Sequence, residues 1–107
     1  MMAEYVYGWV DGEPHPFELA RDLVKEFSDV LTTVHFHVGG GVAIITMYMG
    51  DVVIWCGNRI LTVTVNYDRV LEHTVAEILR IVRRYARPIQ ITVYPSKYTV
   101  VIKSCHR

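Results

Sequence analysis

Short segments in which apolar and polar residues alternate fill most of the chain, and two longer segments place apolar residues at helical spacing. Alternation with a period of two is typical of a strand, while spacings of three and four residues are typical of an amphipathic helix. The alternating segments predict strands at 4–10, 32–38, 42–49, 52–56, 59–65, 89–94 and 98–103. Turns marked by glycine or proline separate them, at 39–41, 50–51, 57–58 and 95–97.

Helical spacing predicts two helices. The first begins at Pro16, a residue favoured at the first helical position, and has Glu18 in its first turn, where the helix dipole favours an anion. Its apolar stripe consists of Ala20, Leu23, Val24, Phe27 and Leu31. The second covers about residues 68–87 and ends before Pro88, because proline disfavours helix in the preceding residue. Its stripe consists of Leu71, Val75, Ile78, Leu79, Val82 and Ala86.

The same order of elements occurs twice, with an offset of 55 positions. Each copy contains a strand, a helix, a strand, a turn and another strand. This predicts pseudo-repeats over about 4–49 and 59–103, with an extra strand at about 52–56 between them. A chain of 107 residues fits one domain, and two helices with one stripe each can both be buried on one face of an antiparallel sheet.

We therefore expect a single α+β domain over residues 1–107, with two layers: an antiparallel sheet of about seven strands and two helices on one of its faces. This plan resembles, in general outline, tandem folds used for small-ligand sensing. More distantly, it is similar to the saddle of the TATA-box-binding protein, in which residues 43–57 would match a strand pair joined by a glycine-containing turn. That saddle has no counterpart to the strand at 52–56, and the resemblance implies no functional residues.

Composition narrows the class of protein. Apolar residues make up 51% of the chain and charged residues 21%, which excludes intrinsic disorder. Residues 38–57 are long enough to cross a bilayer as a helix, but Asp51 and five glycines oppose this, so we expect no membrane partner. The start, residues 1–4, lacks the basic and apolar segments of a secretory signal, which predicts a cytoplasmic location.

The sheet face away from the helices is the main candidate site. Its expected members are aromatic or uncharged, where a solvated face would carry many Lys and Glu, so we expect it to meet a second copy, a ligand or nucleic-acid bases. The candidate interface or ligand residues are Tyr5, Tyr7, Trp9, His35, His37, Gln90, Thr92 and Tyr94, accompanied by Thr33, Thr62 and Thr64.

Catalytic signatures are missing from the sequence. His35 and His37 would point to the same side of a strand and could supply two metal ligands, but no carboxylate follows them as it does in cupins, so two exposed polar histidines are the favoured interpretation. Cys56 ends a β-branched strand, where burial keeps a thiol protonated. No nucleophile elbow and no pair of carboxylates suited to acid and base work is present. We expect no cofactor and favour a protein that is not an enzyme.

Charge is distributed unevenly. Residues 1–68 hold nine acids and three bases, while residues 69–107 hold eight bases and two acids. The candidate basic patch is Arg80, Arg83, Arg84, Arg87, Lys97 and Lys103. The favoured interpretation is a pair of solvated helix faces that attract one another within the fold or between subunits. The alternative is contact with phosphates or an acidic partner.

Three functions stay open on this basis. The favoured one is a noncatalytic binding or assembly module, a homo-oligomer formed through the aromatic and polar sheet face. The second is nucleic-acid binding through the basic face of the second helix, which is disfavoured because the aromatic residues and the arginines are expected on opposite layers. The third is a small-ligand or metal site at the strand that carries His35 and His37. The sequence does not identify a ligand.

Overall fold

The computed structural model describes residues 1–29, 31–39, 42–94 and 100–103, with side chains for 1–29, 33–37 and 44–94. The helices are α1 (Pro16–Glu26) and α2 (Glu72–Val82), and a short 3-10 turn, η1, covers Val10–Gly12. The strands are β1 (Met2–Trp9), β2 (Leu31–Gly39), β3 (Val42–Met49), β4 (Val52–Cys56), β5 (Ile60–Asn66), β6 (Ala86–Tyr94) and β7 (Val100–Lys103).

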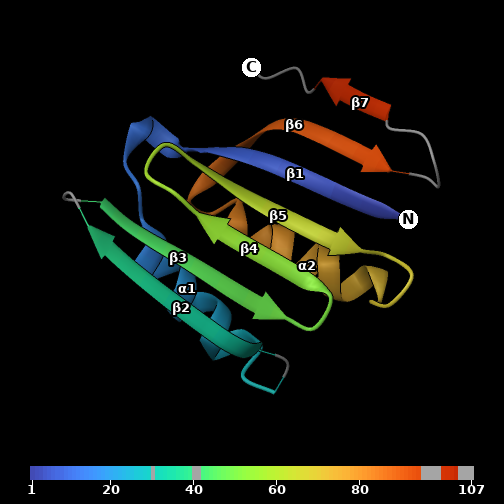
Figure 1. Cartoon of the computed structure of the whole chain (residues 1–107), viewed down its shortest axis with the longest axis horizontal. Helices are drawn as coiled ribbons and strands as arrows, with labels where there is room; N and C mark the ends of the chain where they lie inside the picture. Colours follow the sequence, from blue (N-terminus) through green and yellow to red (C-terminus); the bar gives the residue numbers. More distant parts are fainter. Residues whose placement is uncertain (30, 40–41, 95–99, 104–107) are drawn as a thin grey trace.

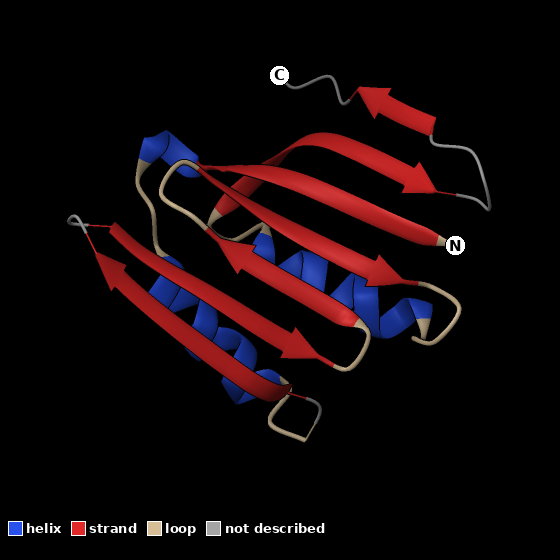
Figure 2. Cartoon of the chain, viewed as in Figure 1, coloured by secondary structure: helices blue, strands red, loops and turns tan. Residues whose placement is uncertain are grey.

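The strands form one antiparallel sheet in the order β2-β3-β4-β5-β1-β6-β7. Both helices lie on the same face of this sheet, with α1 behind β2 and β3 and α2 behind the central strands (Figure 1). Figure 2 shows the resulting two layers, helices on one side and strands on the other. The expected α+β class, with an antiparallel sheet and two helices, is confirmed. None of the described helices is long and apolar enough to span a membrane.

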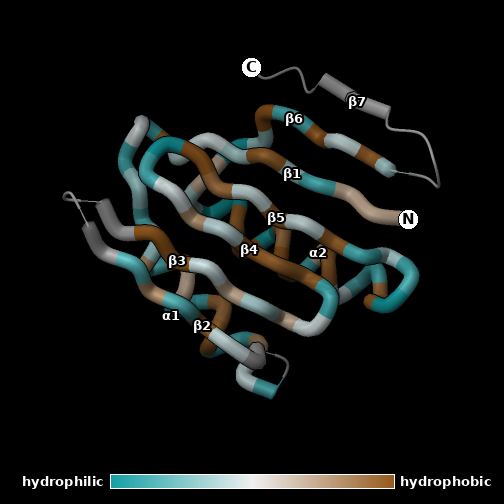
Figure 3. Tube along the Cα trace, in the orientation of Figure 1, coloured by the Kyte–Doolittle hydropathy of each residue, from teal (hydrophilic) through white to brown (hydrophobic). Residues whose placement is uncertain are grey.

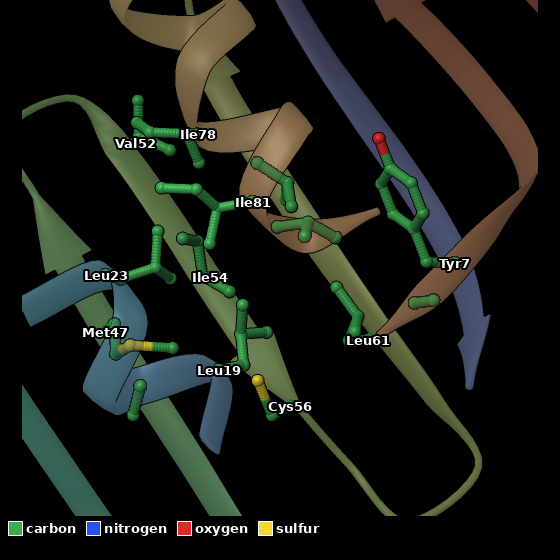
Figure 4. Close-up of a cluster of buried hydrophobic side chains, with 14 of the residues drawn as sticks. Tyr7, Leu19, Leu23, Met47, Val52, Ile54, Cys56, Leu61, Ile78 and Ile81 are labelled. Carbon is green, nitrogen blue, oxygen red and sulfur yellow. The ribbon is translucent and has the colours of Figure 1, made fainter. Parts of the chain in front are cut away.

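The hydrophobic core lies between the helices and the sheet. Leu19 and Leu23 of α1 and Ile78 and Ile81 of α2 are almost completely buried against alternate residues of β3, β4 and β5 (Figure 4). Figure 3 shows hydrophobic positions along β4, β5 and α2. Each fully buried aliphatic side chain of this kind stabilises the fold by about 1.5–3 kcal/mol relative to exposure. The core therefore fixes which face of the sheet the helices cover.

Helix α2 is shorter than its apolar stripe predicts. It ends at Val82, and Ala86 and Arg87, which we expected in the helix, belong to β6 instead. The Tyr85 carbonyl accepts a hydrogen bond from the Val10 amide at 2.9 Å, and Ala86 pairs with Trp9 in the ladder to β1. Pairing with the first strand of the chain therefore takes these residues from the helix. The C-terminal part of the first stripe is also non-helical, since α1 ends at Glu26 and Leu31 begins β2.

The two predicted pseudo-repeats do not occupy equivalent places in the sheet. The strand that follows α2, β6, lies beside the interior strand β1, whereas the strand that follows α1, β2, lies at the end of the strand order. The extra strand, β4, is inserted between β3 and β5. In addition, β3 is the inner strand of the first hairpin, whereas β6 is the inner strand of the second, so the strand order does not relate the two copies by a two-fold arrangement.

Candidate functional site

The sheet face opposite the helices is crossed by continuous rows of paired residues. We call this surface the open face. Because side chains alternate between the two faces, the buried residues of each strand define the other set as the open face. Its central row, read from β2 to β6 through successive ladder partners, is His35, Thr46, Trp55, Thr62, Val6 and Gln90. The adjacent row is Thr33, Tyr48, Val53, Thr64, Glu4 and Thr92.

Charge is scarce on the open face. In the two rows from β2 to β6, Glu4 is the one charged residue. One more cation, Arg87, pairs with Gly8 on the other side of the central row. Several large side chains are substantially exposed, including Tyr48 and Tyr94 at 39% each and Ile89 at 43%. A solvated antiparallel face normally carries alternating charged residues, so this composition is typical of a surface that meets another molecule.

The aromatic residues of β1 point toward the helices, and not to the open face as we predicted. Tyr7 and Trp9 are 3% and 5% exposed and belong to the hydrophobic core, and Tyr5 packs against that core. The indole Nε1 of Trp9 donates a hydrogen bond to the Gly57 carbonyl at 3.0 Å, so burial leaves its polar atom paired. The placement of these three rings on the open face is therefore wrong.

The reason lies in volume. The space between β1 and α2 is filled by the set of alternate residues that contains the three aromatic rings, while the other set consists of Met2, Glu4, Val6 and Gly8. Ile89 fills the place above Gly8, since a Cβ added there would lie 2.9 Å from the Ile89 Cδ1 atom. Burial also raises the pKa of Tyr7 to about 12, so its hydroxyl stays protonated at neutral pH.

Both β2 histidines lie on the open face, and both are exposed. The His35 ring meets the Tyr48 ring edge-on, with centroids 5.8 Å apart and an interplanar angle of 86°. Among the residues that the structure describes, no group of three His, Cys, Asp or Glu side chains is placed to hold a metal ion. The arrangement of His35 and His37 therefore resembles a polar, aromatic surface more than a metal centre.

The three β6 candidates lie on the open face at its other end. The Gln90 side-chain amide donates to the Thr92 hydroxyl at 3.3 Å, and Thr92 is only 6% exposed. Tyr94 pairs with Met2 across the ladder and is well exposed. The strand therefore contributes a satisfied polar pair and one aromatic side chain to the surface.

The candidate basic patch does not form one surface. Arg80 makes a close ion pair with Glu77, and Arg84 Nη1 lies 3.2 Å from Asp22 Oδ2, whereas Arg87 stands on β6 at the open face. Arg83 caps the end of α2 and is exposed. Lys97 lies outside the described residues, and so does the side chain of Lys103. Of the interpretations offered above, this geometry favours attraction between the two helices within the fold.

A second candidate region is a cavity of about 590 Å³ on the helix side, between α2 and the β1–β6 pair. The hydroxyls of Tyr5 and Tyr67 are 2.5 Å apart at this cavity. Burial is the larger cause and this hydrogen bond the second, and together they raise the pKa of Tyr67 well above its usual range. Glu72 and His73, at the start of α2, also line it. The hydrogen bond between the two hydroxyls accounts for both phenols structurally.

Cys56 is fully buried and free, and burial raises the pKa of its thiol to about 12. The burial of Cys56 in the core is as expected, and burial disfavours the thiolate form that a nucleophile needs. Cys105 lies outside the described residues.

Comparisons with protein-family models, curated proteins and solved structures found no match. The geometry of the chain itself is therefore the basis for any functional inference.

Sequence reasoning missed the aromatic centre of the open face. Trp55 and Tyr48 lie in its two rows, and neither is among the residues expected on this face. The signal was present in the alternation of β4, where Val52, Ile54 and Cys56 are the buried set. Continuing that alternation places Val53 and Trp55 on the opposite side.

Proposed function

We propose that this protein is a noncatalytic assembly module whose open face packs against the open face of a second copy. The observation that carries the proposal is the pair of cross-strand rows from β2 to β6, in which Glu4 is the one charged residue; the ladder to β7 continues them with Lys103 and Val101. Face-to-face packing of two antiparallel sheets is a common way to bury such surfaces. Each copy then has helices on one side and its partner on the other.

The size of the open face suits a stable dimer. Six strands spaced about 4.8 Å apart, with about six residues of 3.3 Å each, give a footprint of roughly 29 by 20 Å. Side-chain relief raises the accessible area above this flat value, toward the roughly 800 Å² per partner of a standard interface. A second copy is thus a partner of matching dimensions.

Charge supports a second copy as the occupant. The chain has no formal net charge, so two copies do not repel each other over long range. Consider a two-fold axis that lies between the two sheets, parallel to the central row and perpendicular to the strands. Because Glu4 lies on one side of the central row and Gly8 and Arg87 on the other, this axis would place Glu4 of each copy over Gly8 and Arg87 of its partner. Each carboxylate would then approach a guanidinium, and Trp55 would lie at the axis against its own copy.

Sedimentation velocity over about 1–200 µM protein tests this arrangement, since interfaces of this kind span micromolar to picomolar Kd. We expect a dimer for the unmodified chain and a monomer for Trp55→Lys and Thr64→Lys, because each places an ammonium in a closed sheet interface. Ser28→Lys adds the same charge at an exposed position away from the face and should leave the dimer intact. A monomer at all concentrations, or a dimer that both open-face lysines leave unchanged, would reject the proposal.

A further inference from the structure

An exposed apolar groove lies on the helix side, between α1 and β2. It measures about 560 Å³ and is lined by Phe17, Ala20, Val24, Val34 and Phe36, with Arg21 and Lys25. Phe17, Val24 and Phe36 are 52%, 41% and 60% exposed, although all three are large hydrophobic residues. The rings of Phe17 and Phe36 stack at 5.9 Å, which keeps both at the mouth of the groove. Exposed apolar side chains gathered in this way mark an interaction site.

The strand beside the groove has an unpaired edge. In the described part of the sheet β2 pairs with β3 on one side and with no strand on the other. Every second residue of an antiparallel edge strand directs its N–H and C=O groups outward. The nine residues Leu31–Gly39 include no Lys, Asp, Glu or Pro, which are the residues that usually protect such an edge. The edge is therefore able to accept another strand.

Two cations flank the groove. Arg21 and Lys25 are exposed, and within the described residues neither makes an ion pair or a hydrogen bond through its side chain. By contrast, the next acidic residue along the helix, Asp22, is already held by Arg84 and Tyr85. The positive charges beside the apolar lining are thus available for an acidic group.

We propose that this groove and the β2 edge together bind an extended segment of a partner protein, one with apolar side chains at alternate positions and at least one acidic residue. The segment adds to the sheet as a further strand, so its backbone pairs with β2. Its alternate side chains enter the groove between Phe17 and Val34, and its carboxylate approaches Arg21 or Lys25. The site is separate from the open face and does not depend on the self-association proposed above.

A second copy fits this edge less well than an acidic partner. Pairing β2 with its own copy about a two-fold axis would bring the two α1 helices side by side. Arg21 lies at the middle of α1, so the two Arg21 side chains would face each other across the axis, with Lys25 close by. Like charges in such a position destabilise an interface. Charge complementarity therefore selects an acidic segment.

Fluorescence anisotropy with labelled eight-residue peptides tests the proposal. The probe has valine at three alternate positions and one glutamate at the fourth position of the same alternation, so that all four side chains point to the helix side, with threonine at the remaining positions. A matched peptide replaces that glutamate by lysine. We expect saturable binding of the acidic probe, and a Kd about tenfold weaker for the lysine peptide and for the double variant Arg21→Gln, Lys25→Gln, since each lost pair is partly exposed. An acidic probe that carries N-methyl groups on alternate amides should bind least, because it loses its backbone donors.

Variants separate this site from the open face. Phe36→Ser, at a position that is mostly exposed, should remove binding of the acidic probe while the chain stays folded by circular dichroism. Trp55→Lys should leave that binding unchanged, whatever it does to the dimer. The proposal is overturned if the acidic and lysine peptides bind equally, if Phe36→Ser binds as the unmodified chain does, or if Phe36→Ser alone converts a dimer to a monomer. The last outcome would assign the edge to a second copy.

Discussion

Replacing Trp9 by phenylalanine tests the burial of the β1 rings directly. The indole is 5% exposed and its Nε1 donates to the Gly57 carbonyl at 3.0 Å, in a residue that is itself buried. Phenylalanine keeps an aromatic ring but has no donor, so the carbonyl is left unpaired at a cost of about 1–3 kcal/mol. The smaller ring adds about 1 kcal/mol for lost packing. We expect the free energy of unfolding to fall by about 2–4 kcal/mol.

Urea denaturation followed by far-ultraviolet circular dichroism measures this change. With a slope of about 2 kcal/mol per molar urea, the midpoint should fall by about 1–2 M at an unchanged slope. The other tryptophan of the chain provides the matched control, because Trp55 lies on the open face. At a protein concentration low enough to keep the chain monomeric, Trp55→Phe should cost no more than about 1 kcal/mol, the packing lost by a half-buried ring. Equal costs at the two positions, or a negligible cost at Trp9, would refute the assignment of Trp9 to the core.

Three further predictions concern groups whose surroundings are well defined. In a Cys105→Ser background, the Cys56 thiol should react with Ellman's reagent at pH 8 only after unfolding, because burial raises its pKa to about 12; stoichiometric labelling of the folded chain would contradict this. A hydrogen bond from Tyr85, and to a lesser extent one from Arg84, lowers the pKa of Asp22. Asp22→Asn should therefore destabilise the protein by its full amount at pH values above the unfolded pKa of about 3.9. The loss of stability should shrink as the pH falls through the lower pKa of the folded state. Urea curves at successive pH values give this difference, and a pH-independent cost would count against it. Gly57→Ala should lower stability by about 1–3 kcal/mol, because the new methyl group would overlap the Trp55 ring and lie 3.2 Å from the Ile60 carbonyl oxygen. A melting temperature equal to that of the unmodified chain would show that the ring moves aside without cost.

Local patterns were sufficient where the decisive interactions are local. Residues 42–49 and 52–56 form strands as expected, joined at Gly50, whose φ of +63° suits a tight turn. The start of α1 at Pro16 follows equally from a preference of the first helical turn. Such features depend on a few neighbouring residues, so the sequence contains most of what determines them.

Distant interactions account for what the sequence did not predict. Alternation in β1 defines two sets of side chains. Which set is buried depends on the space between β1 and α2, and Tyr7 and Trp9 fill that space. The end of α2 depends in the same way on the pairing of Ala86 with Trp9. The position of β4 between β3 and β5 decides that Trp55 joins the candidate site, and no local pattern encodes which strands become neighbours.

The central place of β1 also governs how the chain can fold as it leaves the ribosome. Met2 pairs with Asn66 on one side and with Tyr94 on the other, so both neighbours of the first strand are synthesised long after it. Until β5 and β6 emerge, the rings that β1 buries have no partner strands. Contacts of such high sequence separation slow folding, so this sheet closes only as its last strands are delivered.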